Sequence, residues 1–249
     1  MIILKNAAEI DAIARAGRIL AELHRELAKR VQPGVSTAGL DHFTEDFIRS
    51  HDGAEPAFKG LYGFPASLCT SVNEEVVHGI PSAGRELREG DVVSVDAGVK
   101  LHGWFADAAR TVAVGTVTEE VRRLLDVTRQ ALDAGIDQAR PGNRLGDVGH
   151  AIQQVAENEG FGVVRDLVGH GIGREPHEEP QVPNYGRPGR GLRLQEGLVL
   201  AIEPMINAGG IDVRTLADRW TVVTADGSRS AHFEETVAVT ADGPRVLTA

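Results

Sequence analysis

Apolar residues recur every three or four positions in four stretches of the chain, the spacing of an amphipathic helix. The first and third stretches are followed by Pro33-Gly34 and Pro141-Gly142, pairs that end helices. Ser36 stands just before the second stretch, where an N-cap residue is expected, and the third stretch follows Thr118. The pattern therefore predicts four helices, at residues 7–30, 37 to about 53, 119 to about 140 and 145 to about 160.

Short runs of β-branched and apolar residues lie between and after these helices. They predict strands at residues 91–96, 104–114, 198–202 and 236–239. No stretch of linker-like composition separates the two parts of the chain. The pattern therefore indicates an α/β chain without a flexible joint.

Several short motifs occur twice, in the same order. Pro-Gly, His-Gly-Ile, Glu-Gly and Thr-Val-Ala-Val appear at 33–34, 78–80, 89–90 and 111–114, and again at 141–142, 170–172, 196–197 and 236–239. A repeat of this length indicates a duplicated αβ unit. We expect two halves, at about residues 1–115 and 116–249, packed around a pseudo-two-fold axis that brings the repeated positions together.

Four carboxylates belong to the predicted apolar strands, where charged residues are unusual. Asp96 ends the first strand, and its repeat counterpart Glu203 follows the third. Asp107 and Glu234 belong to the other two, each an even number of residues before the repeated threonine and so on the same face. Carboxylates buried together repel one another unless cations or protons neutralise them.

A pair of divalent metal ions would neutralise this cluster, and His170, framed by glycines in 169–173, is the candidate imidazole ligand. Taken singly, an aspartate at a strand end is usually a turn or cap residue, and Asp107 alone could face solvent. Glu235 is expected on the opposite face, solvated or in an ion pair. The four acids together favour a metal centre.

Six other histidines have no such setting. We expect them to be packed or exposed without a role in the site: His24, His42, His51, His102, His150 and His232.

Composition narrows the class of protein. The chain has 249 residues, a net charge of −10 and 42% hydrophobic residues, which is ordinary for a globular protein. The acidic balance disfavours a nucleic-acid or membrane partner. The single cysteine, Cys69, forms neither an intrachain disulfide nor a Cys-rich zinc site. With no signal-peptide layout and no spanning stretch, we expect a cytoplasmic protein.

Four segments resemble the motifs of the methionine aminopeptidase family, in the family's order along the whole chain: 71–81, 169–173, 177–180 and 202–205. The resemblance implies the pita-bread fold, an α/β (α+β) arrangement with a pseudo-two-fold symmetric, curved antiparallel sheet and helices on its outer side. It also implies one catalytic domain over residues 1–249. The short interval from Glu203 to Glu234, and the lack of a Cys-rich extension, resemble the compact bacterial type I form.

The resemblance assigns five metal ligands for two divalent ions. It implies that Asp96 chelates one ion, that His170 and Glu203 bind the other, and that Asp107 and Glu234 bridge them. This donor set suits Co, Mn, Fe or Zn and does not choose among them.

The same resemblance implies three catalytic residues. Glu203 would carry the proton from the attacking water to the leaving amine. His177 would donate a hydrogen bond to the developing oxyanion, and His78 would bond the scissile amide nitrogen or the leaving residue.

A pocket for the methionine side chain is also implied, lined by Phe64, Cys69 and Trp220 with Tyr62 nearby. An aromatic and sulfur-lined slot suits a thioether. Core packing explains Cys69 equally simply, and it stays open as the less favoured explanation for Trp220. Two residues depart from the family pattern and could alter the pocket. Leu61 stands where an aromatic residue is common, and Pro176 stands where a bulky apolar residue is common.

The resemblance predicts removal of the N-terminal methionine from nascent polypeptides, favoured by a small second residue, by a monomer working near the ribosome. Two alternatives stay open: an X-Pro aminopeptidase or dipeptidase on the same scaffold, and a metal-free binding protein of the same fold.

Overall fold

The computed structural model describes residues 2–249. Its helices are α1 (Ala7–Arg30), α2 (Thr37–Arg49), α3 (Glu119–Asp137) and α4 (Leu145–Asn158), with a 3-10 turn at Leu61–Gly63. The strands of the first half are β1 (Ala54–Pro56), β2 (Cys69–Val72), β3 (Glu75–Val77), β4 (Val92–Leu101) and β5 (Trp104–Ala113). Those of the second half are β6 (Gly162–Val163), β7 (Gly169–Gly171), β8 (Glu178–Val182), β9 (Val199–Ile202), β10 (Met205–Asn207), β11 (Val213–Thr215), β12 (Val222–Thr224), β13 (Ser230–His232), β14 (Glu235–Thr240) and β15 (Gly243–Val246).

Local signals set the helix boundaries. Asn6 and Glu9 form a capping box at the start of α1, satisfying backbone donors that the first turn leaves free. The side chain of Ser36 accepts a hydrogen bond from the first turn of α2, as predicted, and that of Thr118 accepts one from the first turn of α3. Helix α2 ends at Arg49, a few residues earlier than predicted.

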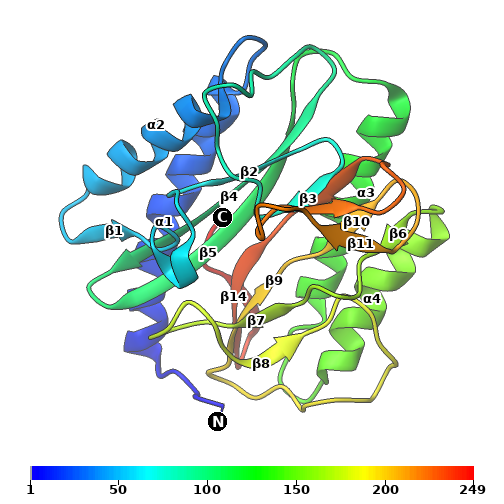
Figure 1. The fold of residues 1–249 in the computed structure, drawn as a ribbon. Helices are drawn as coiled ribbons and strands as arrows, with labels where there is room; N and C mark the ends of the chain where they lie inside the picture. The colour runs from blue at the N-terminus through cyan, green and yellow to red at the C-terminus, as the bar shows by residue number, and fades with distance from the viewer. Residues whose placement is uncertain (1) are drawn as a thin grey trace.

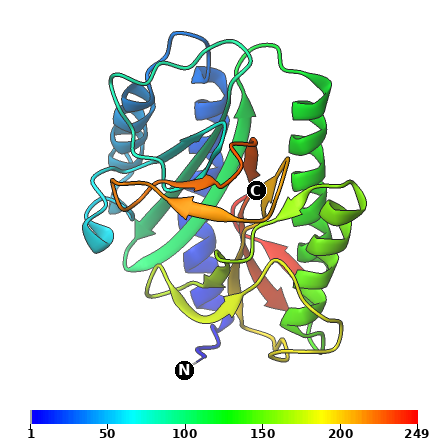
Figure 2. The ribbon, with the colours of Figure 1, turned by 45° about the vertical axis from the view of Figure 1, so that its right-hand side comes forward.

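The strands pair antiparallel in four sheets, and two of them build the centre of the molecule. One has the order β1-β4-β2, with β5 paired to β4, and the other has the order β15-β14-β9-β7-β8. The two meet where Ala109 of β5 bridges to Glu234, directly before β14. In Figure 2 the strands lie between α2 on one side and α3 and α4 on the other. Figure 1 shows α1 behind β4 and β5.

The two halves repeat at the level of single hydrogen bonds. Ser94 pairs with Thr111 in the first half, and Ala201 pairs with Thr236 in the second. The amide of Gly90 donates to Val114 at 2.9 Å, and that of Gly197 donates to Val239 at 2.9 Å. Both glycines have positive φ, 88° and 90°, which glycine adopts without strain. The predicted pseudo-symmetry is therefore confirmed.

One predicted repeat pair is wrong. His170 lies in β7 opposite Ala201, whose equivalent in the first half is Ser94. The residue opposite Ser94 is Ser71, so Ser71 is the equivalent of His170. His78 instead follows β3, which pairs with β12. The shared letters His-Gly-Ile therefore do not mark equivalent positions.

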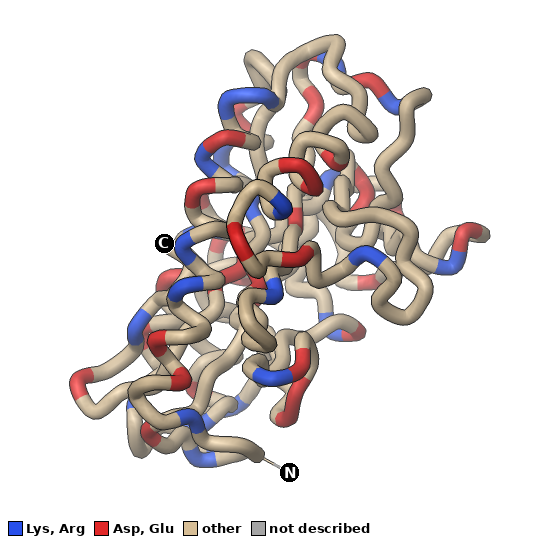
Figure 3. Tube along the Cα trace, turned by 90° about the vertical axis from the view of Figure 1, so that its left-hand side faces the viewer, with Lys and Arg blue, Asp and Glu red and all other residues tan. Residues whose placement is uncertain are grey.

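Charged residues of both signs are spread over the surface. Figure 3 shows basic and acidic residues interspersed along the helices on the side nearest the viewer. Within residues 2–249, no helix combines the length and apolar character that crossing a membrane requires.

Helix α1 is fixed to β5 by a buried histidine. His24 is 6% exposed, and its Nε2 lies 2.9 Å from the carbonyl oxygen of Ala108. Burial, reinforced by the charge of Arg110, lowers the pKa of His24 to about 3. His24 is therefore neutral in the folded chain at neutral pH, packed as predicted.

We expect His24 to make the protein acid-sensitive. Its folded pKa is below the unfolded value, so the unfolded chain binds the extra proton and stability falls as pH drops from 6.5 toward about 3. The loss is about 1.4 kcal/mol per pH unit at most. Urea unfolding at pH 6 and pH 5 should show a smaller drop for His24→Gln than for wild type. Equal drops would contradict this assignment.

Candidate metal centre

A cavity of about 580 Å³ opens beside the junction of the two central sheets. That size is typical of small-ligand sites. One part of its wall is polar and the other is apolar. The polar wall includes Asp96, Asp107, His170, His177, Glu203, His232 and Glu234, and the apolar wall includes Phe58, Leu61, Phe64, Val77, Leu167 and Met205.

Strand register brings three of the predicted carboxylates together. Asp96 lies inside β4, opposite Ala109 of β5, rather than at a strand end as predicted. Asp107 is two residues from Ala109 and therefore on the same face. Glu234 bridges to Ala109 from the other sheet, immediately before β14 begins. Ala109 thus stands between the three acids without a bulky side chain to separate them.

The second half contributes the remaining two residues. Glu203 directly follows β9, whose last residue Ile202 pairs with Glu235, so Glu203 and Glu234 are neighbouring positions. His170 pairs with Ala201, two residues before Glu203. The Nε2 of His170 lies 3.6 Å from Oε1 of Glu203.

These residues fit a divalent metal ion. Ligand atoms of Asp107, His170 and Glu234 all lie within 4.8 Å of one another. One carboxylate oxygen each of Asp96, Asp107 and Glu234 is buried without a hydrogen-bond partner among residues 2–249. Unpartnered buried oxygens are costly in a protein, and carboxylate with imidazole is a donor set of transition metals.

The electrostatics of the cluster point the same way. Burial, together with the neighbouring Glu203, raises the pKa of Asp96 to about 7, and burial raises the pKa of Glu203 to about 7. The pKa values of Asp107 and Glu234 are raised well above their usual range by burial and by the surrounding acids. In the absence of cations the acids therefore share protons, which cations would replace.

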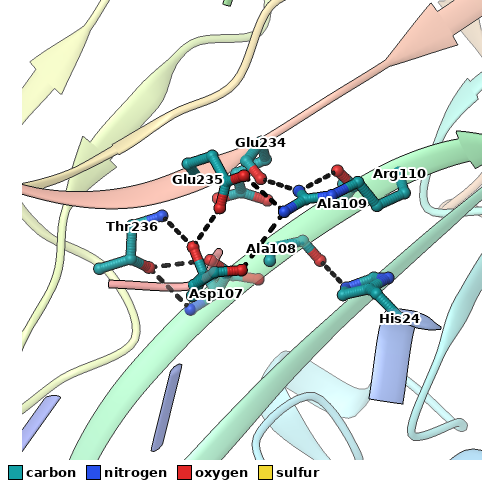
Figure 4. A network of polar contacts seen from close by, with 9 residues as sticks. His24, Asp107, Ala108, Ala109, Arg110, Glu234, Glu235 and Thr236 are labelled. Carbon is teal, nitrogen blue, oxygen red and sulfur yellow. Dashed lines mark hydrogen bonds and ion pairs between the residues drawn. The ribbon is translucent and has the colours of Figure 1, made fainter. Parts of the chain in front are cut away.

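Two threonine hydroxyls hold this site across the pseudo-axis. The hydroxyl of Thr236 donates to the carbonyl of Asp107 at 2.8 Å and accepts its amide at 3.0 Å (Figure 4). The hydroxyl of Thr111 likewise donates to the carbonyl of His232 at 2.8 Å and accepts its amide at 2.8 Å. These threonines begin the repeated Thr-Val-Ala-Val motifs.

Arg110 and Glu235 form an ion pair behind the site, at 2.5 Å (Figure 4). Arg110 also donates to the carbonyl of Glu234 at 2.5 Å. Glu235 is only 8% exposed, so of the two roles expected for it, the structure shows the ion pair. This pair fixes the backbone next to Glu234.

His232 is the site residue that sequence analysis missed. We expected it to have no place in the site, but it lines the cavity, 1% exposed, with its Nε2 3.6 Å from Oε2 of Glu203. That nitrogen has no hydrogen-bond partner in the described chain. The repeat offered a signal for it: His232 precedes Thr236 by the same number of residues as Asp107 precedes Thr111. The other five histidines expected to be bystanders do not line the cavity.

His78 and His177 both line the cavity. Burial, with a smaller contribution from His232, lowers the pKa of His78 to about 4. Burial and the neighbouring His78 lower the pKa of His177. Both rings are therefore neutral at pH 7, each with one N–H to donate. The centroids of the His177 and His170 rings lie 4.4 Å apart.

The residues predicted to line a methionine pocket lie together in one apolar cluster beside the cavity. The rings of Phe64 and Trp220 meet edge to face, with centroids 5.1 Å apart. Cys69 is buried directly opposite Asp96 in the β2–β4 pair. Tyr62 is 75% exposed, with a left-handed backbone (φ 51°), and stacks on His177 at 5.9 Å. Leu61 packs beside this group.

Comparison with known proteins identifies the class. The model of metallopeptidase family M24 matches residues 11–241, and the chain belongs to this family. The chain is 56% identical to the methionine aminopeptidase of Clostridium perfringens, over 100% of this chain and 99% of that protein. The chain is thus a metallopeptidase of the methionine aminopeptidase type.

Solved structures agree. The methionine aminopeptidase of Rickettsia prowazekii, 44% identical, superposes with a TM-score of 0.98 and full coverage of both chains. The pita-bread fold is therefore confirmed. A prolidase of Pyrococcus horikoshii, 23% identical, has a TM-score of 0.80, and this chain covers 63% of it. That likeness shows a shared fold alone.

We expect Asp107→Asn to stabilise the metal-free protein while weakening metal binding. Without metal, the Asp107 carboxyl must at pH 8 either carry a buried charge or take up a proton, and both cost stability. The variant removes this carboxyl but keeps the backbone contacts with Thr236. At pH 8 the melting temperature in EDTA should rise by roughly 2–4 °C for each ~1 kcal/mol of relieved repulsion. Added Mn²⁺ or Co²⁺ should then raise it much less than in wild type.

Glu55→Gln is the matched control, because Glu55 is an exposed carboxylate on β1, a strand of the sheet that also contains Asp107. It should leave both melting temperatures unchanged. A metal-free Asp107→Asn that is less stable than wild type would show that the acids do not strain the fold.

Proposed function

We propose that the chain removes the N-terminal methionine from newly made polypeptides whose second residue is small. The observation that supports this most directly is one cavity lined both by the acid–imidazole cluster and by the apolar group of Phe64, Cys69 and Trp220, which we take as the slot for the first side chain. A chain end with its first side chain in the slot would place the first peptide bond beside the cluster. Holding the reacting groups next to one another in this way removes a large part of the activation barrier for hydrolysis.

Two divalent ions of Co, Mn, Fe or Zn are proposed, held by Asp96, Asp107, His170, Glu203 and Glu234. When bound, such ions activate water and polarise a carbonyl. The neutralisation of four buried acids supports two ions rather than one.

The chain's own residues would then handle protons and charge. Glu203, whose oxygens lie 3.6 Å from Nε2 of His170 and from Nε2 of His232, would take a proton from the attacking water and pass it to the leaving amine. His177, as a neutral donor, would bond the developing oxyanion. His78 would hold the scissile amide nitrogen or the residue that leaves.

We further propose one catalytic domain over residues 1–249, made of halves at about 1–115 and 116–249. We propose that it acts as a monomer in the cytoplasm, on nascent chains close to the ribosome, with no nucleic-acid or membrane partner of its own.

The decisive test is metal analysis together with cleavage of Met-Ala-Ser. The purified protein should bind divalent metal and release methionine from this peptide, and it should leave an Ala-Pro peptide intact. Turnover of Ala-Pro alone would instead support an X-Pro peptidase. Failure to take up any added metal would support the metal-free binding protein.

Glu203→Gln and His170→Ala should each reduce the turnover of Met-Ala-Ser by roughly 10²–10⁴-fold, because one removes the proton carrier and the other a ligand. Circular dichroism should show that both variants are folded. His42→Ala, which changes an exposed histidine on α2, is the control and should keep full turnover. Normal rates in either site variant would remove the proposed mechanism.

His177→Ala should lower kcat by about 10²–10³-fold with a much smaller rise in KM, since an oxyanion donor acts mainly in the transition state. Steady-state kinetics on Met-Ala-Ser would measure the split. A change in KM alone would mean that His177 only binds the substrate.

A further inference from the structure

A buried ion pair joins the N-terminal segment to the loop that carries His177. The Nζ of Lys5 lies 2.5 Å from Oε2 of Glu178, and the two side chains are only 2% and 6% exposed. Lysine and glutamate are rarely buried so completely. A buried pair of this kind adds little net stability, so a geometric role is the better explanation for it.

On the loop side, the Glu178 carboxylate closes the chain on itself. Its Oε1 accepts the backbone amides of Arg174 at 2.7 Å and Glu175 at 3.3 Å. Residues 174–178 therefore form a tight turn around this carboxylate, and His177 is part of that turn.

On the other side, Lys5 is itself held in place. Its Nζ donates to the carbonyl of Ile3 at 3.0 Å, and its amide donates to the carbonyl of Gly197 at 2.7 Å. Gly197 lies just before β9, the strand that leads to Glu203. Lys5 thus links the loop of one catalytic candidate to the strand that positions another.

The path of the Lys5 side chain requires a glycine. A Cβ on Gly173 would lie 2.5 Å from Cε of Lys5 and 2.8 Å from Oε1 of Glu178. Gly173 is the last residue of the 169–173 motif that contains His170. The close approach shows that lysine, carboxylate and loop are packed as one unit.

The His177 ring has no anchor of its own. It is only partly covered by the cavity wall, and within residues 2–249 neither ring nitrogen makes a hydrogen bond. Its ring contacts are with Tyr62 and His170. With no hydrogen bond to hold it, the ring can keep these two contacts only while the loop backbone stays in place.

We propose that Lys5 is a positioning residue: through Glu178 it holds the 173–178 loop so that His177 faces the cavity. The kinetic part of this inference rests on the proposed function, and the structural part does not. Without the ammonium group, the Glu178 carboxylate would be buried and unpaired, and it would turn toward solvent and release the amides of Arg174 and Glu175.

Hydrogen exchange tests the structural part. In Lys5→Met the amides of Arg174 and Glu175 should exchange about tenfold faster or more than in wild type. Lys29→Met is the matched control, because Lys29 pairs with Glu26 on the exposed face of α1. Unchanged exchange at both amides in Lys5→Met would overturn the proposal.

Kinetics on Met-Ala-Ser test the catalytic part. Lys5→Met should lower kcat about tenfold or more with KM within about twofold, and it should have no further effect in a His177→Ala background. Additive losses would show that Lys5 does not act through His177. Absence of any wild-type cleavage would defeat the proposed function, while the exchange data would still decide on the loop.

A neutral double variant covers the case in which Lys5→Met does not fold. Lys5→Met/Glu178→Gln leaves no unpaired buried charge but still lacks the tether. It should fold, with fast exchange at Arg174 and Glu175 and a low kcat. Wild-type exchange and kinetics in this variant would reduce the pair to a packing feature.

Discussion

The structure depends on a reciprocal contact between its two halves. Each of two threonine hydroxyls, on Thr111 and Thr236, both donates to and accepts from the backbone of one residue in the opposite half. A hydroxyl can do both at once, which is why this residue type suits the position. The residues so held are His232 and Asp107, and both face the cavity. The same contact therefore holds the two halves together and fixes the backbone of two residues that line the cavity.

A site of this kind works against the stability of its own fold. The acids stand among buried valines and alanines of β4, β5 and β9, where a charge is poorly solvated. Raised pKa values at Asp96 and Glu203 are the direct expression of that cost. The surrounding hydrogen bonds bind the backbone rather than the carboxylate oxygens, so the scaffold stays rigid while the oxygens remain free for cations.

Local chemistry allowed much of this to be predicted. The approximate extent of helix α1 was predicted because its limits are set by nearby side chains, and the acids were found because they interrupt apolar runs. Contacts between distant segments were not predictable in this way. His232 reaches Glu203 only because β13 pairs with β10. Lys5 contacts Glu178, which lies far from it along the chain. The predicted equivalence of His78 and His170 was wrong because identical residue types do not show which strands pair.

Duplication explains the positions of the site but not its chemistry. By strand register, Asp96 is equivalent to Glu203, Asp107 to His232, Ala109 to Glu234 and Ser71 to His170. Only the first pair is acidic in both halves. Where the first half has the small residues Ser71 and Ala109, the second half has the imidazole of His170 and the carboxylate of Glu234. A symmetric scaffold thus holds an asymmetric ligand set, and that asymmetry allows a single carboxylate, Glu203, to lie between two imidazoles and differ in role from its counterpart Asp96.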